Sequence, residues 1–139
     1  MRQVDLDTAV GYALKRTTVA LRTAMDAALR DHGLTVPQYS CLEQLAHTPG
    51  LTNAALARGT FVSRQAMHQL LGTLRSADLV QSDGTGRHQQ FNLTKTGAKR
   101  LVGASAAVAD VEERMLATFD SEHRQRLYAD LAACDDALG

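Results

Sequence analysis

Residues 51–94 read LTNAALARGTFVSRQAMHQLLGTLRSADLVQSDGTGRHQQFNLT, and they decide the fold. Helix-forming residues fill 54–58, Gly59 can supply a turn, and Ser63 can cap a second helix. The pattern then becomes strand-like, with turn residues at 83–86 between two short runs. Two short helices joined by a tight turn and followed by a β-hairpin form a winged helix-turn-helix. This layout makes nucleic acid the first partner to test.

The second helix has two chemically different faces. At about 100° per residue, one side receives the apolar residues, which are Ala66, Met67, Leu70, Leu71, Leu74 and Ala77. The other side receives Arg64, Gln65, His68, Gln69, Gly72, Arg75 and Ser76. Arg, Gln and His side chains can bind base edges and phosphates without adding negative charge, which favours DNA as the partner. The alternative is an ordinary amphipathic helix with a solvated polar face.

Charge is unevenly distributed along a chain whose 15 Lys and Arg balance 15 Asp and Glu. Residues 1–50 hold five of each sign, residues 51–100 hold seven basic and two acidic residues, and residues 101–139 hold three basic and eight acidic residues. The positive block coincides with the winged-helix candidate. Because phosphate binding depends on where cations lie, this distribution favours DNA, and an acidic far end would orient the approach. A chance partition of charge is the alternative interpretation.

Length and composition limit the other possibilities. The 139 residues suffice for one domain or a small lobed one. No apolar run approaches the roughly 20 residues that span a bilayer, and the N-terminal residues lack a signal-peptide pattern, so we expect a cytoplasmic protein with no membrane partner. Cys41 and Cys134 are far apart in helical patterns, so we expect two buried structural thiols and neither a disulfide framework nor a zinc site.

Helical patterns also fill the rest of the chain. A long one runs from Val4 to His32, and Gly33 offers a C-terminal stop. Thr35 then opens another helix with a capping box. After the hairpin we expect a long helix from about Lys95 to Thr118 and a last helix from Ser121 to about Ala137.

Three segments of the chain resemble the MarR (multiple antibiotic resistance regulator) family of bacterial transcription factors. They are GLTVPQYSCLEQLAHTPGLTNAALA at 33–57, VSRQAMHQLLGTLRSADLV at 62–80 and RHQQFNLTKTGAKRL at 87–101. They look like the family's helix before the recognition helix, its recognition helix with the following strand, and the exit from its wing. One departure is Thr85, which stands where family wings often have an Asp two residues before the Arg that matches Arg87.

The resemblance implies a homodimer in which the first and the last two helices of each chain interlock. The residues give an independent reason, because the apolar stripes of 102–119 and 127–138 exceed what one small lobe can cover. The expected fold class is mainly α with a small β-hairpin wing. Residues 34–94 would form the winged helix-turn-helix DNA-binding lobe, and residues 1–33 and 95–139 the helical dimerisation region. Such a two-fold dimer binds a pseudo-palindromic operator with half-sites roughly one helical turn apart.

Candidate DNA contacts follow from these positions. For base edges we expect the polar residues of the second helix nearest its start, namely Arg64, Gln65, His68 and Gln69. For the DNA backbone we expect short polar residues and one arginine, namely Thr52, Asn53, Ser63, Thr73 and Arg75. Arg87, near the hairpin tip, is the candidate for the minor groove. We interpret Gly72 as merely tolerated in its helix.

The resemblance also implies regulation by a ligand. Similar proteins commonly respond to small aromatic acids or other phenolic compounds, bound between the dimer helices and the DNA-binding lobe, and repression is the family's usual mode. Tyr12, Arg16 and Tyr39 could line such a cleft, because an arginine pairs with a carboxylate and tyrosines offer flat apolar faces. Alternatively, Arg16 is a solvated or interface residue and Tyr39 only fixes the start of its helix.

Other functions remain as alternatives or are disfavoured. One alternative is a redox-sensing regulator of the same family that uses Cys41, and another is a winged-helix protein-interaction module without DNA binding. The five histidines are scattered, so we expect no metal site and no cofactor. We expect no enzyme either, since the chain has no nucleophile elbow, phosphate-binding glycine loop, HExxH helix or CxxC pair.

Overall fold

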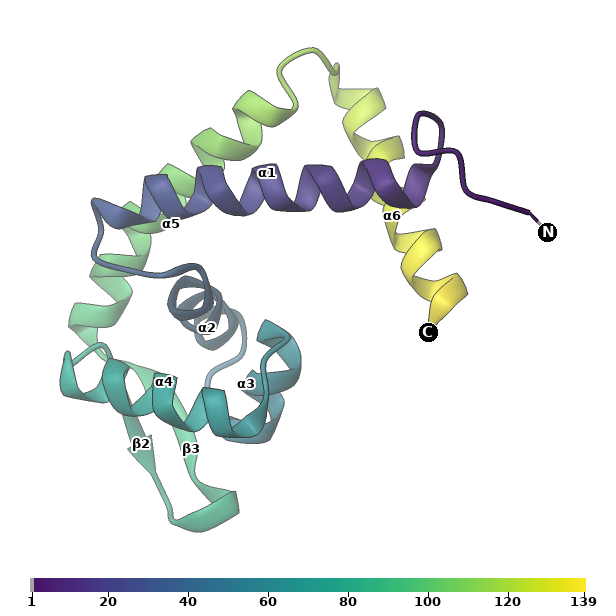
Figure 1. The fold of residues 1–139 in the computed structure, drawn as a ribbon. Coiled ribbons are helices and arrows are strands. Elements are labelled where there is room, and N and C mark those ends of the chain that lie inside the picture. Colours follow the sequence, from purple (N-terminus) through teal and green to yellow (C-terminus); the bar gives the residue numbers. More distant parts are fainter. Residues whose placement is uncertain (1) are drawn as a thin grey trace.

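The computed structural model describes residues 2–139 and has a mainly helical fold with a small antiparallel sheet (Figure 1). Its elements are α1 (Val10–Arg30), α2 (Val36–His47), β1 (Leu51–Thr52), α3 (Asn53–Thr60), α4 (Arg64–Ser76), β2 (Val80–Asp83), the 3-10 helix η1 (Gly86–His88), β3 (Gln90–Leu93), α5 (Lys95–Met115) and α6 (Ser121–Leu138). The predicted fold class, mainly α with a winged helix-turn-helix, is therefore confirmed.

The wing is a three-stranded sheet in the order β1, β3, β2, with both pairs antiparallel. Phe91 of β3 is buried and pairs with Leu51 on one side and Ser82 on the other. The predicted hairpin corresponds to β2 and β3, and η1 lies in the loop between them. The strand β1 was not predicted, because two residues are too short to show the alternation that marks a strand.

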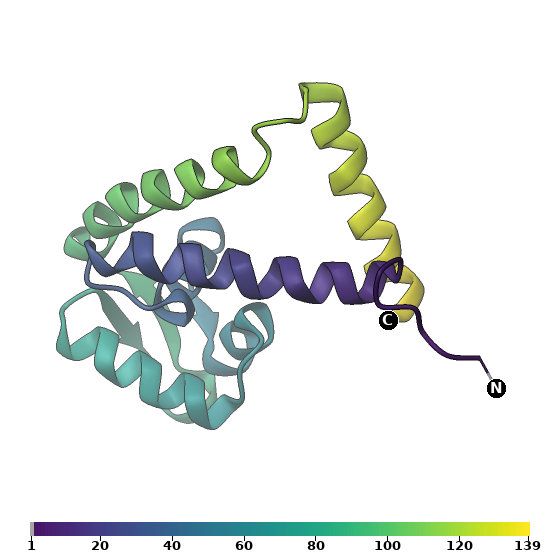
Figure 2. The ribbon, with the colours of Figure 1, turned by 45° about the horizontal axis from the view of Figure 1, so that its top comes forward.

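The apolar core lies between α2, α3, α4 and the sheet. Its fully buried side chains include Leu42, Leu45, Leu56, Met67 and Leu74, which come from all three helices of this lobe. Leu29 at the end of α1, together with Leu101 and Ala104 of α5, joins the same cluster. The inner ends of the two long helices are thus anchored on the lobe, and their other ends extend away from it (Figures 1 and 2).

Two helix boundaries at the N-terminal side follow local hydrogen bonds. The predicted start of the first helix at Val4 is wrong, because the chain turns at Asp5 and α1 begins only at Val10. Val4 is 72% exposed, so this part of the apolar pattern has nothing to pack against in one subunit. The predicted stop at Gly33 is confirmed by its φ of +66°. Gly33 and Leu34 donate backbone N–H groups to the carbonyls of Arg30 and Leu29 respectively, which closes the end of α1.

The turn between α3 and α4 differs from the prediction. Gly59 lies inside α3, and the residue with left-handed backbone is Phe61, with φ of 60°. Gly59 has a different role, since a Cβ atom there would lie 2.8 Å from Oε1 of Gln44 in α2, and the Gln44 side chain would have to shift. The Gln44 amide donates to the Gly59 carbonyl at 3.3 Å. The glycine therefore permits close packing of α3 on α2 rather than a change in chain direction.

The corner between α5 and α6 is held by one arginine. Arg124 donates to the carbonyls of Leu116 and Phe119 and to the carboxylate of Glu113. The Phe119 and His123 rings stack at 4.2 Å beside it. The predicted long helix ends earlier than Thr118, at Met115, and the Asp120 side chain caps α6. From this corner α6 turns back without packing on the lobe, and no residue of α6 is buried (Figures 1 and 2).

Gly97 joins the wing to α5 at a point with no room for a side chain. A Cβ atom there would overlap the carbonyl oxygen of Leu79. We expect Gly97→Ala to destabilise the protein by about 1–3 kcal/mol or more, because the backbone at Leu79, rather than a flexible side chain, must move. Gly11→Ala is the matched control: its Cβ meets nothing within 4 Å, so alanine should be neutral or stabilising by up to about 1 kcal/mol. Urea denaturation of both variants measures this difference, and equal midpoints would contradict it.

Within residues 2–139, no helix has both the length and the apolar character needed to cross a bilayer.

Candidate nucleic-acid interface

The polar face of α4 is directed to solvent. Its exposed residues include all four candidates for base contact and both later candidates for the backbone, namely Arg64, Gln65, His68, Gln69, Thr73 and Arg75. Met67, Leu71 and Leu74 face the core as predicted. Ala66 and Ala77 were predicted on the core side and are exposed instead, at the two edges of the narrower face that Met67, Leu71 and Leu74 bury. At Gly72 a Cβ would meet nothing within 4 Å, which agrees with a tolerated glycine.

Three candidate hydroxyl groups form hydrogen bonds within their own helices. Thr52 accepts from the Ala55 N–H at 3.3 Å and caps α3, and Ser63 accepts from the Ala66 N–H at 3.0 Å and caps α4. Both hydroxyls keep their proton available for a phosphate oxygen. Thr73 instead donates its proton to the Gln69 carbonyl at 3.2 Å, so in this geometry it has no donor left for a phosphate.

A groove separates the start of α4 from the wing. Its volume is about 670 Å³, and its walls come from α3, α4 and the β2–β3 hairpin, with Asn53, Ala54, Arg64, Gln65, His68, Gly86, Arg87, Gln89 and Phe91 lining it. The groove brings together five of the predicted DNA-contacting residues from three separate segments. Two of them, Arg64 and Arg87, are cationic, and none of the lining residues is acidic. The groove is therefore suited to a polyanionic ligand.

Ser82 connects α4 to the wing. Nη1 of Arg75 donates to the Ser82 hydroxyl at 3.0 Å, and the Gln89 amide donates to the same oxygen at 2.9 Å. These bonds hold β2 at a fixed distance from the end of α4. Ser82 and Gln89 were not among the predicted site residues, because their role depends on a contact between segments that no local pattern encodes. Arg75 thus has a structural role in addition to the backbone contact expected for it.

The cations of the lobe are free of ion pairs within the part of the chain that the structure describes. The ion pairs found there are Arg22 with Asp26, Arg124 with Glu113, and Arg126 with Glu122, all on α1, α5 and α6. The basic residues of 51–100 are therefore not neutralised by a contacting carboxylate. Their positive potential extends into solvent, where it can attract phosphates.

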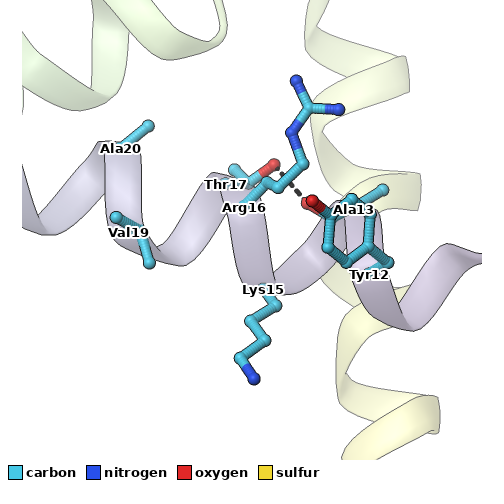
Figure 3. Close-up of a pocket in the computed structure, with 7 residues that line it drawn as sticks. All are labelled: Tyr12, Ala13, Lys15, Arg16, Thr17, Val19 and Ala20. Carbon is cyan, nitrogen blue, oxygen red and sulfur yellow. Dashed lines mark hydrogen bonds between the residues drawn. The ribbon is translucent and has the colours of Figure 1, made fainter. Parts of the chain in front are cut away.

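The three ligand candidates do not meet in one pocket. Tyr12 and Arg16 line a shallow groove of about 700 Å³ formed by residues of α1 alone, and the Arg16 guanidinium lies 5.9 Å from the centre of the Tyr12 ring (Figure 3). Tyr39 belongs to α2 and is buried, and its hydroxyl donates to Glu43 at 3.0 Å. Burial raises the pKa of Tyr39, and Glu43 raises it further. The structure therefore separates Tyr39 from the other two and supports its alternative role in packing the start of α2 beside Leu34.

The two cysteines differ in environment. Cys41 is completely buried in α2, and burial raises the pKa of its thiol to about 12. Cys134 on α6 is exposed, so the prediction that both thiols are buried is wrong for this residue. That prediction assumed that a helical apolar pattern is covered within one subunit, whereas α6 has no buried residue. A buried thiol with a raised pKa has little of the thiolate that reacts with peroxides or disulfides.

We expect Cys41 to be unreactive in the folded protein. The test uses Cys134→Ser, which leaves Cys41 as the single thiol, and a thiol-specific reagent at pH 8. Because that pH is well below the pKa of about 12, the native variant should react at a small fraction of the rate seen after denaturation in urea. Rapid native reaction would contradict the burial of Cys41 and would favour the redox-sensing alternative.

Comparisons with known proteins show the family to which this chain belongs. The model of the MarR family matches residues 32–88. The HTH-type transcriptional repressor Rv2887 of Mycobacterium tuberculosis is 39% identical over 114 residues, which cover 80% of this chain and 82% of the relative. A crystal structure of Rv2887 in complex with DNA superposes with a TM-score of 0.78 at 34% identity, covering 92% of this chain and 98% of that one. Its complex with p-aminosalicylic acid gives a TM-score of 0.77 at 32% identity, covering 92% and 99%. This similarity extends over most of both proteins, and the chain belongs to the MarR family.

Proposed function

We propose that this protein is a homodimeric transcriptional repressor that binds a pseudo-palindromic DNA operator and is released by a small aromatic or phenolic ligand. The name and the DNA complex of the mycobacterial relative support repression through DNA binding. In this role the protein acts as a regulator rather than as an enzyme. Because its target is chromosomal DNA, it works in the cytoplasm.

The observation that supports this proposal most strongly is the cationic groove between α4 and the wing. Arg64, Gln65 and His68 are exposed at the start of α4 and line it, and Gln69 is exposed one residue further along the helix. In a helix-turn-helix, the N-terminal residues of the recognition helix contact base edges in the major groove. We assign base contacts to these four residues, with Arg64 as the donor for guanine.

The remaining contacts are assigned to the DNA backbone and the minor groove. Thr52, Asn53 and Ser63 lie at the starts of α3 and α4, where hydroxyl and amide groups can donate to phosphates. Arg75 contacts a phosphate while it also holds Ser82. Thr73 is the weakest of the predicted backbone contacts, because its proton is bound to Gln69. Arg87, exposed in the hairpin loop, enters the minor groove.

Dimerisation is assigned to the helices at both ends of the chain, in residues 1–33 and 95–139, with the DNA-binding lobe in residues 34–94. On α1, Val10 and Val19 are 76% and 62% exposed. On α6, Leu127, Leu131, Cys134 and Leu138 follow one another at helical spacing along one side, and Leu131 is 44% exposed. Arg124 holds this helix away from its own lobe. Such apolar surface is covered in a two-fold dimer.

The ligand proposal rests on the pair formed by Tyr12 and Arg16. The relative was crystallised with p-aminosalicylic acid and with salicylic acid. An arginine beside an aromatic ring offers a carboxylate partner and a stacking surface together, which suits this class of compound. Tyr39 is buried and its hydroxyl proton is bound to Glu43, so its part in ligand binding is the weaker proposal.

DNA binding at varied salt concentration tests the proposal. A labelled duplex from the DNA beside this gene should be shifted by nanomolar to micromolar protein at low salt, and the affinity should fall steeply as salt rises. Added salicylate should release the duplex and raise the melting temperature of the free protein, by an amount that increases with the logarithm of its concentration above the Kd. Absence of any shift at low salt would contradict the proposal and would favour a protein-interaction module.

A further inference from the structure

Phe61 is an aromatic residue with almost no contact in its own subunit. It lies between α3 and α4 and is 94% exposed, the highest value among the large apolar residues of 2–139. Its backbone is left-handed, with φ of 60° and ψ of 41°. Residues with a Cβ atom rarely adopt this conformation, and bulky ones least of all.

The local structure favours glycine at this position. The Phe61 N–H bonds to the Arg58 carbonyl, and the Val62 N–H bonds to the Ala57 carbonyl at 3.1 Å. This pair of bonds is a Schellman motif, in which the left-handed residue after the helix is usually glycine. Phe61 therefore adds backbone strain, and its exposed ring gains no packing in return. Strained residues of this kind occur preferentially at functional sites.

The position of Phe61 identifies what can cover the ring. Phe61 stands two residues before Ser63, the cap of α4, and three before Arg64. In the proposed complex the start of α4 enters the major groove. A side chain just before that start, such as Phe61, therefore lies against the wall of the groove. Phe61 does not line the cationic groove, which is on the wing side of α4. The proposed dimer surfaces belong to α1 and α6, whereas Phe61 belongs to neither helix and lies in the turn between α3 and α4.

We propose that Phe61 makes an apolar contact with operator DNA, against a thymine methyl group or the carbons of a deoxyribose. The proposal rests on the proposed DNA-binding function and adds a contact that does not involve charge. The wall of the major groove presents both kinds of apolar group to a residue beside the recognition helix. The contact retains an aromatic residue at a position where the fold alone favours glycine.

The variant Phe61→Gly tests the proposal, because it should lower operator affinity without lowering the stability of the fold. Glycine relieves the left-handed strain, so the melting temperature should be unchanged or a few degrees higher. Operator affinity should fall about tenfold, as expected when part of the burial of one phenyl ring is removed. The dependence of affinity on salt should stay the same, because no charge is removed. Phe61→Leu keeps an apolar side chain and the strain, and should restore part of the affinity.

The outcomes distinguish this proposal from the proposed function. If the unaltered protein binds the duplex and Phe61→Gly binds it equally well, the Phe61 contact is wrong and DNA binding stands. If the unaltered protein binds no duplex at low salt, the proposed function itself fails. Replacing thymines one at a time by deoxyuridine locates the contact. Loss of affinity at one position, seen in the unaltered protein and absent in Phe61→Gly, indicates the methyl group, and no loss at any position indicates the sugar.

Discussion

Leu131→Asp should convert the dimer to a monomer and abolish operator binding at working concentrations. Leu131 is 44% exposed in the single subunit, so the substitution costs the isolated fold little. In the proposed dimer the new carboxylate would be buried in an apolar interface, and the two-fold symmetry introduces it twice. Loss of the second half-site should lower DNA affinity by about 10²- to 10⁴-fold. Analytical ultracentrifugation and anisotropy titration measure the two effects.

Ala129→Asp is the matched control for this experiment. It introduces the same carboxylate on α6, at an exposed position on the opposite side of the helix from Leu131. We expect this variant to remain dimeric and to bind the operator. If Leu131→Asp also remains dimeric, the assignment of α6 to the dimer interface is incorrect.

Removing both Arg64 and Arg87 should weaken DNA binding and flatten its salt dependence. The two side chains line opposite walls of the same groove and have no acidic partner within the part of the chain that the structure describes. Removal of one good base contact costs about 1–3 kcal/mol. For every phosphate that is no longer neutralised, the slope of log affinity against log salt should decrease in magnitude by about 0.9. Titration of Arg64→Ala/Arg87→Ala at several salt concentrations measures both.

Arg126→Ala provides the control for net charge, because it removes one positive charge, as the single variant Arg64→Ala does. Arg126 is exposed on α6 and lies 3.9 Å from Glu122, far in sequence from the groove. Its removal should leave the affinity and the salt slope nearly unchanged. An equal fall in affinity for both changes would mean that overall charge, and not the position of the cations, governs binding.

Short-range chemistry made much of the lobe predictable. The capping box of Thr35, the cap at Ser63 and the stop at Gly33 depend on residues a few positions apart, so the sequence contains them completely. The helical period placed Met67, Leu71 and Leu74 on the core side of α4 for the same reason. These local signals also placed the exposed polar residues at the start of α4 correctly on the solvent side.

Features that depend on contacts between distant segments were not predictable. Gly59 was assigned to a turn because its contact with Gln44 of α2 is invisible in the local pattern. Phe61 took the left-handed position although its residue type argues against it. The link from Arg75 through Ser82 to Gln89 and the separation of Tyr39 from Tyr12 also depend on tertiary arrangement. Exposure of Cys134 reflects surface that a single subunit leaves uncovered.

A footprint of the protein on the DNA beside its gene tests the central claim most directly. A symmetric dimer that inserts one α4 into each of two successive major grooves should protect two blocks whose centres lie about 10 base pairs apart, related by an inverted repeat. Protection should reach the flanking minor grooves, where Arg87 is expected, and should shrink there in Arg87→Ala. A single protected block without internal symmetry, or protection unaffected by Arg64→Ala and Arg87→Ala, would contradict a dimer that reads DNA with this groove.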